Sequence, residues 1–165
     1  MFRRLSEIPP FDNVYLHSIP GRNESWPEFL EGLKEMSIDV LVNLVSFKEI
    51  EYVCPEYYKQ ISEGSLPTEY KYFPITDYSA PSLEERTEYR DFVSSLLKLI
   101  HNSKRILIHC GAGIGRTGTV ATSILLEAGL TLEKSMKIVD AAGSGAEVDK
   151  QLELLNWYTD EVKSV

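Results

Sequence analysis

Cys110 and Arg116 are the residues of this 165-residue chain whose types and spacing point most directly to chemistry. They open and close a glycine-rich segment with Gly111, Gly113 and Gly115 between them. Glycines let a backbone curl closely around a ligand, and the planar guanidinium fork matches the oxygens of a phosphate. A nearby cation and a helix N-terminus also favour the thiolate form of a cysteine. The segment is therefore predicted to hold a phosphate and to supply a nucleophile for its phosphorus atom.

The flanking sequence indicates how this segment is positioned. An apolar run at 106–108 precedes it, and a stretch of small and apolar residues, 117–128, follows it. This order predicts a strand, a loop and a helix, with backbone N–H groups and the positive end of the helix dipole directed at one spot. The predicted phosphate-binding residues are Gly111, Ala112, Gly113, Ile114, Gly115 and Arg116.

The ten residues HCGAGIGRTG, from His109 to Gly118, resemble the signature of the cysteine-dependent protein tyrosine phosphatase superfamily, above all its dual-specificity-like members. The preceding apolar strand, the three glycines and the trailing Thr-Gly make the match far more specific than the Cys–Arg spacing alone. A buried structural cysteine would not need a glycine cage that ends in arginine. The resemblance implies the α/β fold of that superfamily and catalysis by Cys110.

The same resemblance implies roles for Thr117 and Gln151. The Thr117 hydroxyl would donate a hydrogen bond to the Cys110 sulfur and help the thiolate to leave in the second step. Gln151, near the start of the last predicted helix, would position the attacking water, and the alternative for it is a surface glutamine. Apart from the resemblance, the place of His109 directly before the nucleophile predicts a ring hydrogen bond that orients the loop, and a role as a base is the alternative.

Cleavage of a phosphate ester also requires a proton for the departing oxygen, which a carboxylic acid on a loop can donate. Asp77 follows a predicted strand at 69–75 and lies 33 residues before Cys110. In a parallel sheet both would reach the same edge, and the resembled superfamily carries its general acid at such a place. Asp91 is the alternative, but it falls inside a predicted helix. Asp77 is therefore predicted to be the general acid.

Predicted strands and helices alternate along the chain, which predicts one α/β domain over residues 1–165, with a mainly parallel sheet flanked by helices. Capping boxes at 25–28 and 82–85 indicate helix starts. Residues 1–12 are interpreted as a lead-in, and 47–67 as a helix followed by a loop. The predicted strands are 13–18, 38–45, 69–75 and 104–110, and the other helices are 25–36, 82–101, 117–128, 132–142 and one from 148.

Charge, the N-terminal segment and the cysteines limit the binding partners and the cellular location that we expect. The net charge of −8 argues against general binding to nucleic acids or anionic membranes. The N-terminal segment MFRRLSEIPP lacks the apolar run of a secretory signal, and no window approaches the length of a membrane span. A cysteine nucleophile must stay reduced, so we expect a reducing, cytoplasmic location. The resemblance also leaves open a protective disulfide between Cys54 and Cys110.

The scattered histidines and cysteines form no ligand cluster, so no metal or cofactor is predicted. The expected partner is a phosphorylated protein or peptide, with no nucleic acid, and a monomer is favoured. The predicted activity is hydrolysis of phosphotyrosine, with phosphoserine and phosphothreonine left open, through a cysteinyl-phosphate. Phosphoinositide, inositol-polyphosphate and RNA 5′-phosphatases are alternatives, although the uncharged residues of the loop disfavour highly phosphorylated substrates. A non-catalytic phosphate-binding module is a further alternative.

Overall fold

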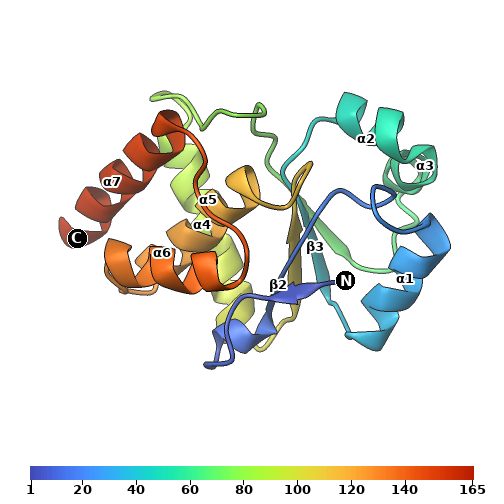
Figure 1. The fold of residues 1–165 in the computed structure, drawn as a ribbon, viewed down its shortest axis with the longest axis horizontal. Coiled ribbons are helices and arrows are strands. Elements are labelled where there is room, and N and C mark those ends of the chain that lie inside the picture. The colour runs from blue at the N-terminus through green and yellow to red at the C-terminus, as the bar shows by residue number, and fades with distance from the viewer.

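A computed structural model describes residues 1–165 as a central sheet with helices on both faces (Figure 1). The sheet has five strands in the order β1-β2-β5-β3-β4, and only β1 is antiparallel to its neighbour. The predicted α/β fold with a mainly parallel sheet is confirmed. The strands are β1 (Arg3–Arg4), β2 (Val14–His17), β3 (Val40–Asn43), β4 (Glu69–Tyr72) and β5 (Ile106–His109).

The three inner strands, β2, β3 and β5, are buried at every position. Such near-continuous apolar runs are typical of parallel strands that are covered on both faces. β5 pairs in register with β2 on one side and with β3 on the other, so that His109 lies between His17 and Asn43. The chain leaves β5 at the centre of the sheet edge, and the loop that follows is thereby held on both sides.

Two groups of helices cover the sheet (Figure 1). One face carries α1 (Trp26–Glu35), α2 (Phe47–Val53) and α3 (Pro55–Glu63), and the other carries α4 (Arg86–His101), α5 (Gly115–Glu127), α6 (Leu132–Ala141) and α7 (Asp149–Lys163). A short 3-10 helix, Phe11–Asn13, precedes β2. α5 packs against α4, α6 and α7, which explains its burial almost throughout. None of the helices combines the length and apolar character needed to cross a bilayer.

Three predictions of local structure need correction. The supposed lead-in contains β1, which pairs with β2. Residues 47–67 form two helices rather than one, because Pro55 lacks an N–H and begins a new helix. α4 begins at Arg86 rather than just after Ser82. The Glu85 N–H bonds to the Ser82 carbonyl at 3.1 Å, so residues 82–85 form a turn before the helix.

The predicted capping box at Ser25 is confirmed, and it fixes the start of α1. An equivalent box at Ser46 and Glu49, which the sequence interpretation overlooked, starts α2. The parallel strands end at one edge of the sheet, where the segments after β3, β4 and β5 come together. This is the edge at which parallel α/β sheets bind ligands.

Gly118 in α5 marks a close approach between α5 and the segment that joins α6 to α7. A Cβ atom on Gly118 would overlap the backbone of Gly145. The segment from 142 to 148 therefore packs directly on the helix that follows the Cys110 loop.

We expect Gly118→Ala to lower the free energy of unfolding by about 1–3 kcal/mol, because the overlap forces the backbone apart. The better helix propensity of alanine, about 1 kcal/mol, acts in the opposite direction. Urea unfolding measures the difference. Gly145→Ala is the matched control, since its Cβ would enter open space, and equal stability of the two variants would contradict the packing argument.

Candidate active site

The loop between β5 and α5 carries backbone N–H groups without partners. The N–H groups of Gly111, Ala112 and Ile114 donate to no group of the chain. The first N–H groups of α5, at Gly115 and Arg116, have no intrahelical partner either. Unpaired backbone donors in a folded protein are costly unless something else pairs with them. These donors are therefore available to an anion, and phosphate binding by these residues stays a prediction.

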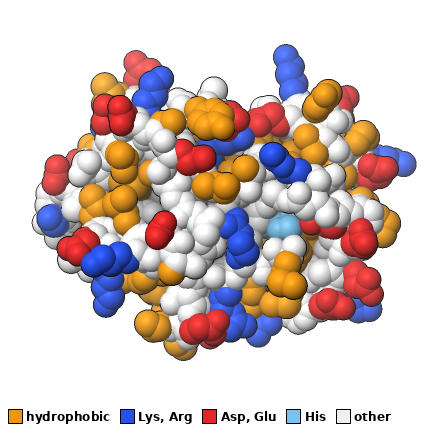
Figure 2. Space-filling view, in the orientation of Figure 1, with side chains coloured by type: hydrophobic (Ala, Val, Ile, Leu, Met, Phe, Trp, Pro, Cys, Tyr) orange, Lys and Arg blue, Asp and Glu red, His pale blue; other side chains and the backbone are white.

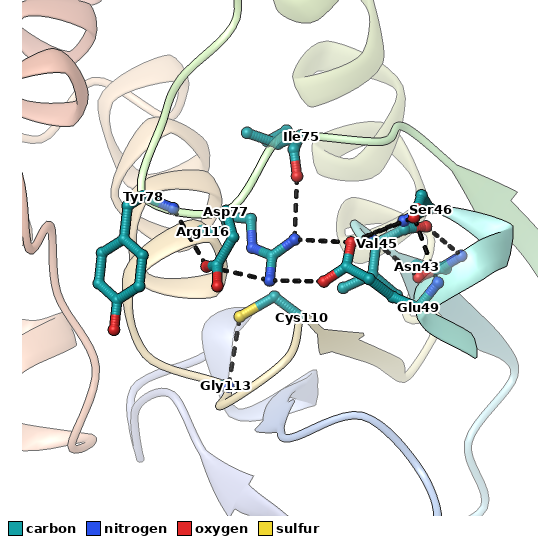
Figure 3. A network of polar contacts seen from close by, with 10 residues as sticks. All are labelled: Asn43, Val45, Ser46, Glu49, Ile75, Asp77, Tyr78, Cys110, Gly113 and Arg116. Carbon is teal, nitrogen blue, oxygen red and sulfur yellow. Dashed lines mark hydrogen bonds and ion pairs between the residues drawn. The ribbon is translucent and has the colours of Figure 1, made fainter. Parts of the chain in front are cut away.

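Cys110 is buried at the start of this loop, and its sulfur accepts a hydrogen bond from the Gly113 N–H at 3.2 Å (Figure 3). The predicted hydrogen bond from Thr117 to this sulfur is not formed, since the Thr117 hydroxyl is buried and has no partner. Gly113 has a positive φ of 76°, and a Cβ atom there would overlap the backbone of His17. Glycine at 113 is thus required for the loop conformation that directs this N–H at the sulfur.

Arg116 is 3% exposed, and three groups hold its guanidinium beside Cys110 (Figure 3). Both terminal nitrogens donate to the carboxylate of Glu49, at 3.2 and 3.1 Å. One nitrogen also lies 3.1 Å from Asp77 Oδ1, and the other donates to the Ile75 carbonyl at 2.9 Å. Burial alone would lower the pKa of Arg116, but the two carboxylates and the charge of Cys110 raise it, so the guanidinium stays charged.

Asp77 lies at the predicted sheet edge, on the loop that follows β4, and it lines the same pocket as Cys110. β4 ends at Tyr72, earlier than the predicted 75, although Phe73 and Ile75 still donate to the backbone of residues 43 and 44. The Asp77 side chain is 61% exposed. Asp91, the alternative acid, lies in α4 and lines a separate groove. Of the two aspartates, the structure therefore brings only Asp77 to the Cys110 pocket.

Glu49 is the residue of the site that sequence reasoning missed. Its carboxylate accepts from the Ser46 N–H at 3.1 Å as well as from Arg116. Partial burial acts to raise its pKa, but these hydrogen bonds outweigh burial and lower the pKa below the usual value for a glutamate. The capping-box spacing of Ser46 and Glu49 was the available signal for the helix start. This spacing gives no indication that Glu49 would pair with Arg116, 67 residues further along the chain.

His109 supports the loop from within the core. It is fully buried, and its Nε2 is hydrogen-bonded to the Tyr57 hydroxyl at 2.8 Å, while Nδ1 has no partner. Burial lowers the pKa of His109 to about 3, so the imidazole is neutral. The ring bond that the sequence led us to expect is present. It joins β5 to α3 rather than reaching the loop itself.

Gln151 is 1% exposed, which excludes the surface alternative. Its amide oxygen accepts from the Glu147 N–H at 2.7 Å, and its amide nitrogen donates to the Ser79 carbonyl at 3.2 Å. Gln151 thus ties the segment before α7 to the loop that carries Asp77, and its amide also lies against Gly115. That it positions a water molecule stays a prediction.

Cys110 and Arg116 line a pocket of about 490 Å³. Its charged lining has three carboxylates, Glu49, Asp77 and Glu147, against two arginines, Arg22 and Arg116, and contains no lysine. Tyr52 and Tyr78 also line it. Over the face seen in Figure 2, acidic, basic and apolar side chains are interspersed. No group of three or more His, Cys, Asp or Glu is arranged to hold a metal ion, and Cys54 and Cys110 are both free thiols.

Comparisons with known proteins agree with this geometry. A family model described as "Polymorphic toxin system, DSP-PTPase phosphatase" matches residues 17–130. No sequence among the curated proteins matches the chain. Among solved structures, Tk-PTP in its active form is 25% identical with a TM-score of 0.71, over 96% of each chain.

Two further structures share the fold at lower identity. Kinase associated phosphatase, with its catalytic cysteine replaced by serine, is 18% identical with a TM-score of 0.79, over 99% of this chain and 95% of that one. PTPMT1 is 17% identical with a TM-score of 0.72, over 99% of this chain and 97% of that one. A structure of PTPMT1 in complex with PI(5)P has similar values.

The buried neutral His109 predicts that acid destabilises the protein. The pKa of His109 is about 3 in the folded chain against 6.5 for an unperturbed histidine, so between these values the unfolded chain binds the extra proton. Stability from this residue is therefore present above the unfolded pKa and is lost as the pH falls below it. From about pH 7.5 to about pH 5 the loss is about 2 kcal/mol.

Urea unfolding of the wild type and His109→Gln at both pH values measures this loss, and the variant should show a pH dependence smaller by about that amount. His101→Gln is the control, because His101 is exposed at the end of α4, and it should behave like the wild type. An unchanged pH dependence in His109→Gln would rule out the explanation.

Proposed function

Because this chain belongs to the DSP-PTPase phosphatase family of polymorphic toxin systems, we propose that it hydrolyses phosphotyrosine in proteins or peptides through a cysteinyl-phosphate, with phosphoserine and phosphothreonine as further substrates to be tested. The observation that carries the proposal is the set of unpaired N–H groups in the Cys110 loop, together with the buried guanidinium of Arg116 beside it. A dianionic phosphate supplies the missing partners of these donors.

In the first step, the Cys110 thiolate attacks phosphorus in line with the ester oxygen, so that an S–P bond forms as the P–O bond to tyrosine breaks. The loop N–H groups and Arg116 stabilise the charge on the equatorial oxygens. Asp77 gives its proton to the departing phenolate oxygen. Its exposed position in the pocket that Cys110 also lines supports this role.

In the second step, water attacks the phosphorus atom of the cysteinyl-phosphate. Asp77, now a carboxylate, takes a proton from this water. The S–P bond breaks, inorganic phosphate leaves and the thiolate is restored. The unpaired Thr117 hydroxyl is available to donate to the sulfur as negative charge returns to it. Gln151 contributes to the same step by holding in place the segments that carry Glu147 and Asp77, to which its side-chain amide is hydrogen-bonded.

The charges around the pocket favour a substrate with a single phosphate. The carboxylates of Glu49 and Glu147 would repel additional phosphates on an inositol ring or a nucleic acid. Tyr52 and Tyr78, which are 91% and 65% exposed, line the pocket, where their rings can contact the ring of a phosphotyrosine. These features support phosphotyrosine over the phosphoinositide that PTPMT1 binds in its complex.

We expect Cys110→Ser to lose nearly all hydrolysis of p-nitrophenyl phosphate, and Asp77→Asn to lose about 10²–10⁴-fold, the usual contribution of a general acid. The measurement is steady-state hydrolysis in the presence of a chelator. Asp91→Asn is the matched control, because it changes an aspartate outside the pocket. Equal activity of the wild type and Cys110→Ser would refute the nucleophile. Phosphate binding without any turnover would favour the non-catalytic module.

The rim tyrosine Tyr52 gives a prediction about substrate choice. Tyr52→Ala should raise KM for a phosphotyrosine peptide by about 3–10-fold, the equivalent of one aromatic contact, while a phosphoserine peptide should be affected less. Glu51→Ala is the control, since this residue is an exposed neighbour in α2 outside the pocket. A di- or triphosphorylated inositol lipid in the same panel tests the alternative substrate class, and faster turnover of that lipid would reverse the assignment.

A further inference from the structure

Arg3, on the short strand β1, lies behind the Cys110 loop and binds backbone on two separate segments. One terminal nitrogen donates to the carbonyls of Ala142, at 3.2 Å, and Gly143 at the end of α6. The other terminal nitrogen donates to the carbonyl of Gly113 in the loop. The Arg3 guanidinium thus joins the Cys110 loop to the segment between α6 and α7.

The Gly113 carbonyl has a second donor. The Ser144 hydroxyl, itself buried, donates to the same oxygen at 2.6 Å. A carbonyl oxygen has two lone pairs, so Arg3 and Ser144 together saturate this acceptor. Partial burial lowers the pKa of Arg3, and the nearby charge of Cys110 acts in the opposite sense, so the cation also contributes to the electrostatic field at the loop.

The direction of this carbonyl determines the direction of one of the unpaired donors. In a planar trans peptide the C=O of one residue and the N–H of the next point in opposite directions. The Gly113 carbonyl is held outward by Arg3 and Ser144, so the Ile114 N–H points the other way and has no partner in the chain. Gly113 has a φ of 76°, a region in which glycine moves freely, so the loop sequence alone does not prevent this peptide from turning over.

We propose that Arg3 is a positioning residue for phosphate binding. With Ser144 it clamps the Gly113–Ile114 peptide so that its N–H, and not its carbonyl oxygen, faces the bound phosphate. A reversed peptide would direct a negative dipole at a dianion and remove one of its donors. The inference rests on the proposed phosphate site, and it adds residues from outside the range 17–130 that the family model matches.

The register of the sheet explains why a residue so early in the chain reaches the loop. β1 runs antiparallel to β2 with Arg3 opposite Leu16, one residue before the end of that strand. β2 lies beside β5, and just beyond it the Ile19 N–H donates to the Gly111 carbonyl at 3.1 Å. Arg4, the next residue of β1, instead pairs with Glu7 at the surface at 2.7 Å. The two adjacent arginines therefore form a natural test pair.

The test compares Arg3→Ala with the matched control Arg4→Ala. The readouts are kcat and KM for p-nitrophenyl phosphate, the inhibition constant of inorganic phosphate, and urea unfolding. We expect Arg3→Ala to weaken phosphate inhibition by about tenfold, as for the loss of one good donor, and to raise KM, with Arg4→Ala unchanged within about twofold. Millimolar guanidinium ion should restore part of the lost affinity in Arg3→Ala alone, an effect that a general loosening of the fold would not give.

Ser144→Ala is the second variant, and it keeps the proposal testable if Arg3→Ala does not fold. Removal of this neutral donor should weaken phosphate binding several-fold. The phosphate affinity of Arg3→Lys should lie between those of the wild type and Arg3→Ala, because an ammonium group cannot bridge both segments as a guanidinium does. Wild-type phosphate inhibition in folded Arg3→Ala, or in both Ser144→Ala and Arg3→Lys, would overturn the clamp and leave the proposed function intact. A wild type that neither binds nor hydrolyses phosphate would overturn both.

Discussion

The unpaired N–H groups of the loop after β5 are the feature on which the rest of the structure depends. A backbone that leaves several donors without partners gives up stability, so the surrounding fold must hold it in place. β5 is fixed between β2 and β3, the fully buried His109 bonds to Tyr57 behind the loop, and α5 is packed against α4, α6 and α7. Core packing thus offsets the cost of these unpaired donors, and a phosphate bound at the proposed site would supply their partners.

Much of this arrangement could be predicted from the sequence because the loop is encoded locally. The glycines, Cys110 and Arg116 stand within a few residues of one another, and the strand before them and the helix after them follow from the hydrophobic pattern. Asp77 could be predicted as well, since a parallel sheet brings the ends of its strands to one edge. These inferences need only spacing and topology.

The contacts that hold Arg116 and Gly113 could not be predicted in the same way. Glu49 lies 67 residues from Arg116, and Arg3 lies 110 residues from Gly113. Both bonds depend on strand register and on the exact start of a helix, which hydrophobic periodicity determines only within a few residues. Neither residue type is unusual in its local sequence, and β1 has only two residues, Arg3 and Arg4, too few for any periodic signal. Long-range polar contacts therefore complete a site whose centre is local.

The two carboxylates on Arg116 differ in a way that suits the proposed reaction. Glu49 is fixed by the cap of α2, in which it bonds to both the N–H and the hydroxyl of Ser46, so it can keep the guanidinium in place throughout. Asp77 pairs with Arg116, and its Oδ1 accepts one further hydrogen bond, from the N–H of the adjacent Tyr78 at 3.1 Å, on an exposed loop. An incoming phosphate dianion would compete with Asp77 for the same guanidinium nitrogen and repel its charge, which favours displacement of Asp77 toward the leaving oxygen. The arrival of the substrate thereby releases the carboxyl group whose proton the first step requires.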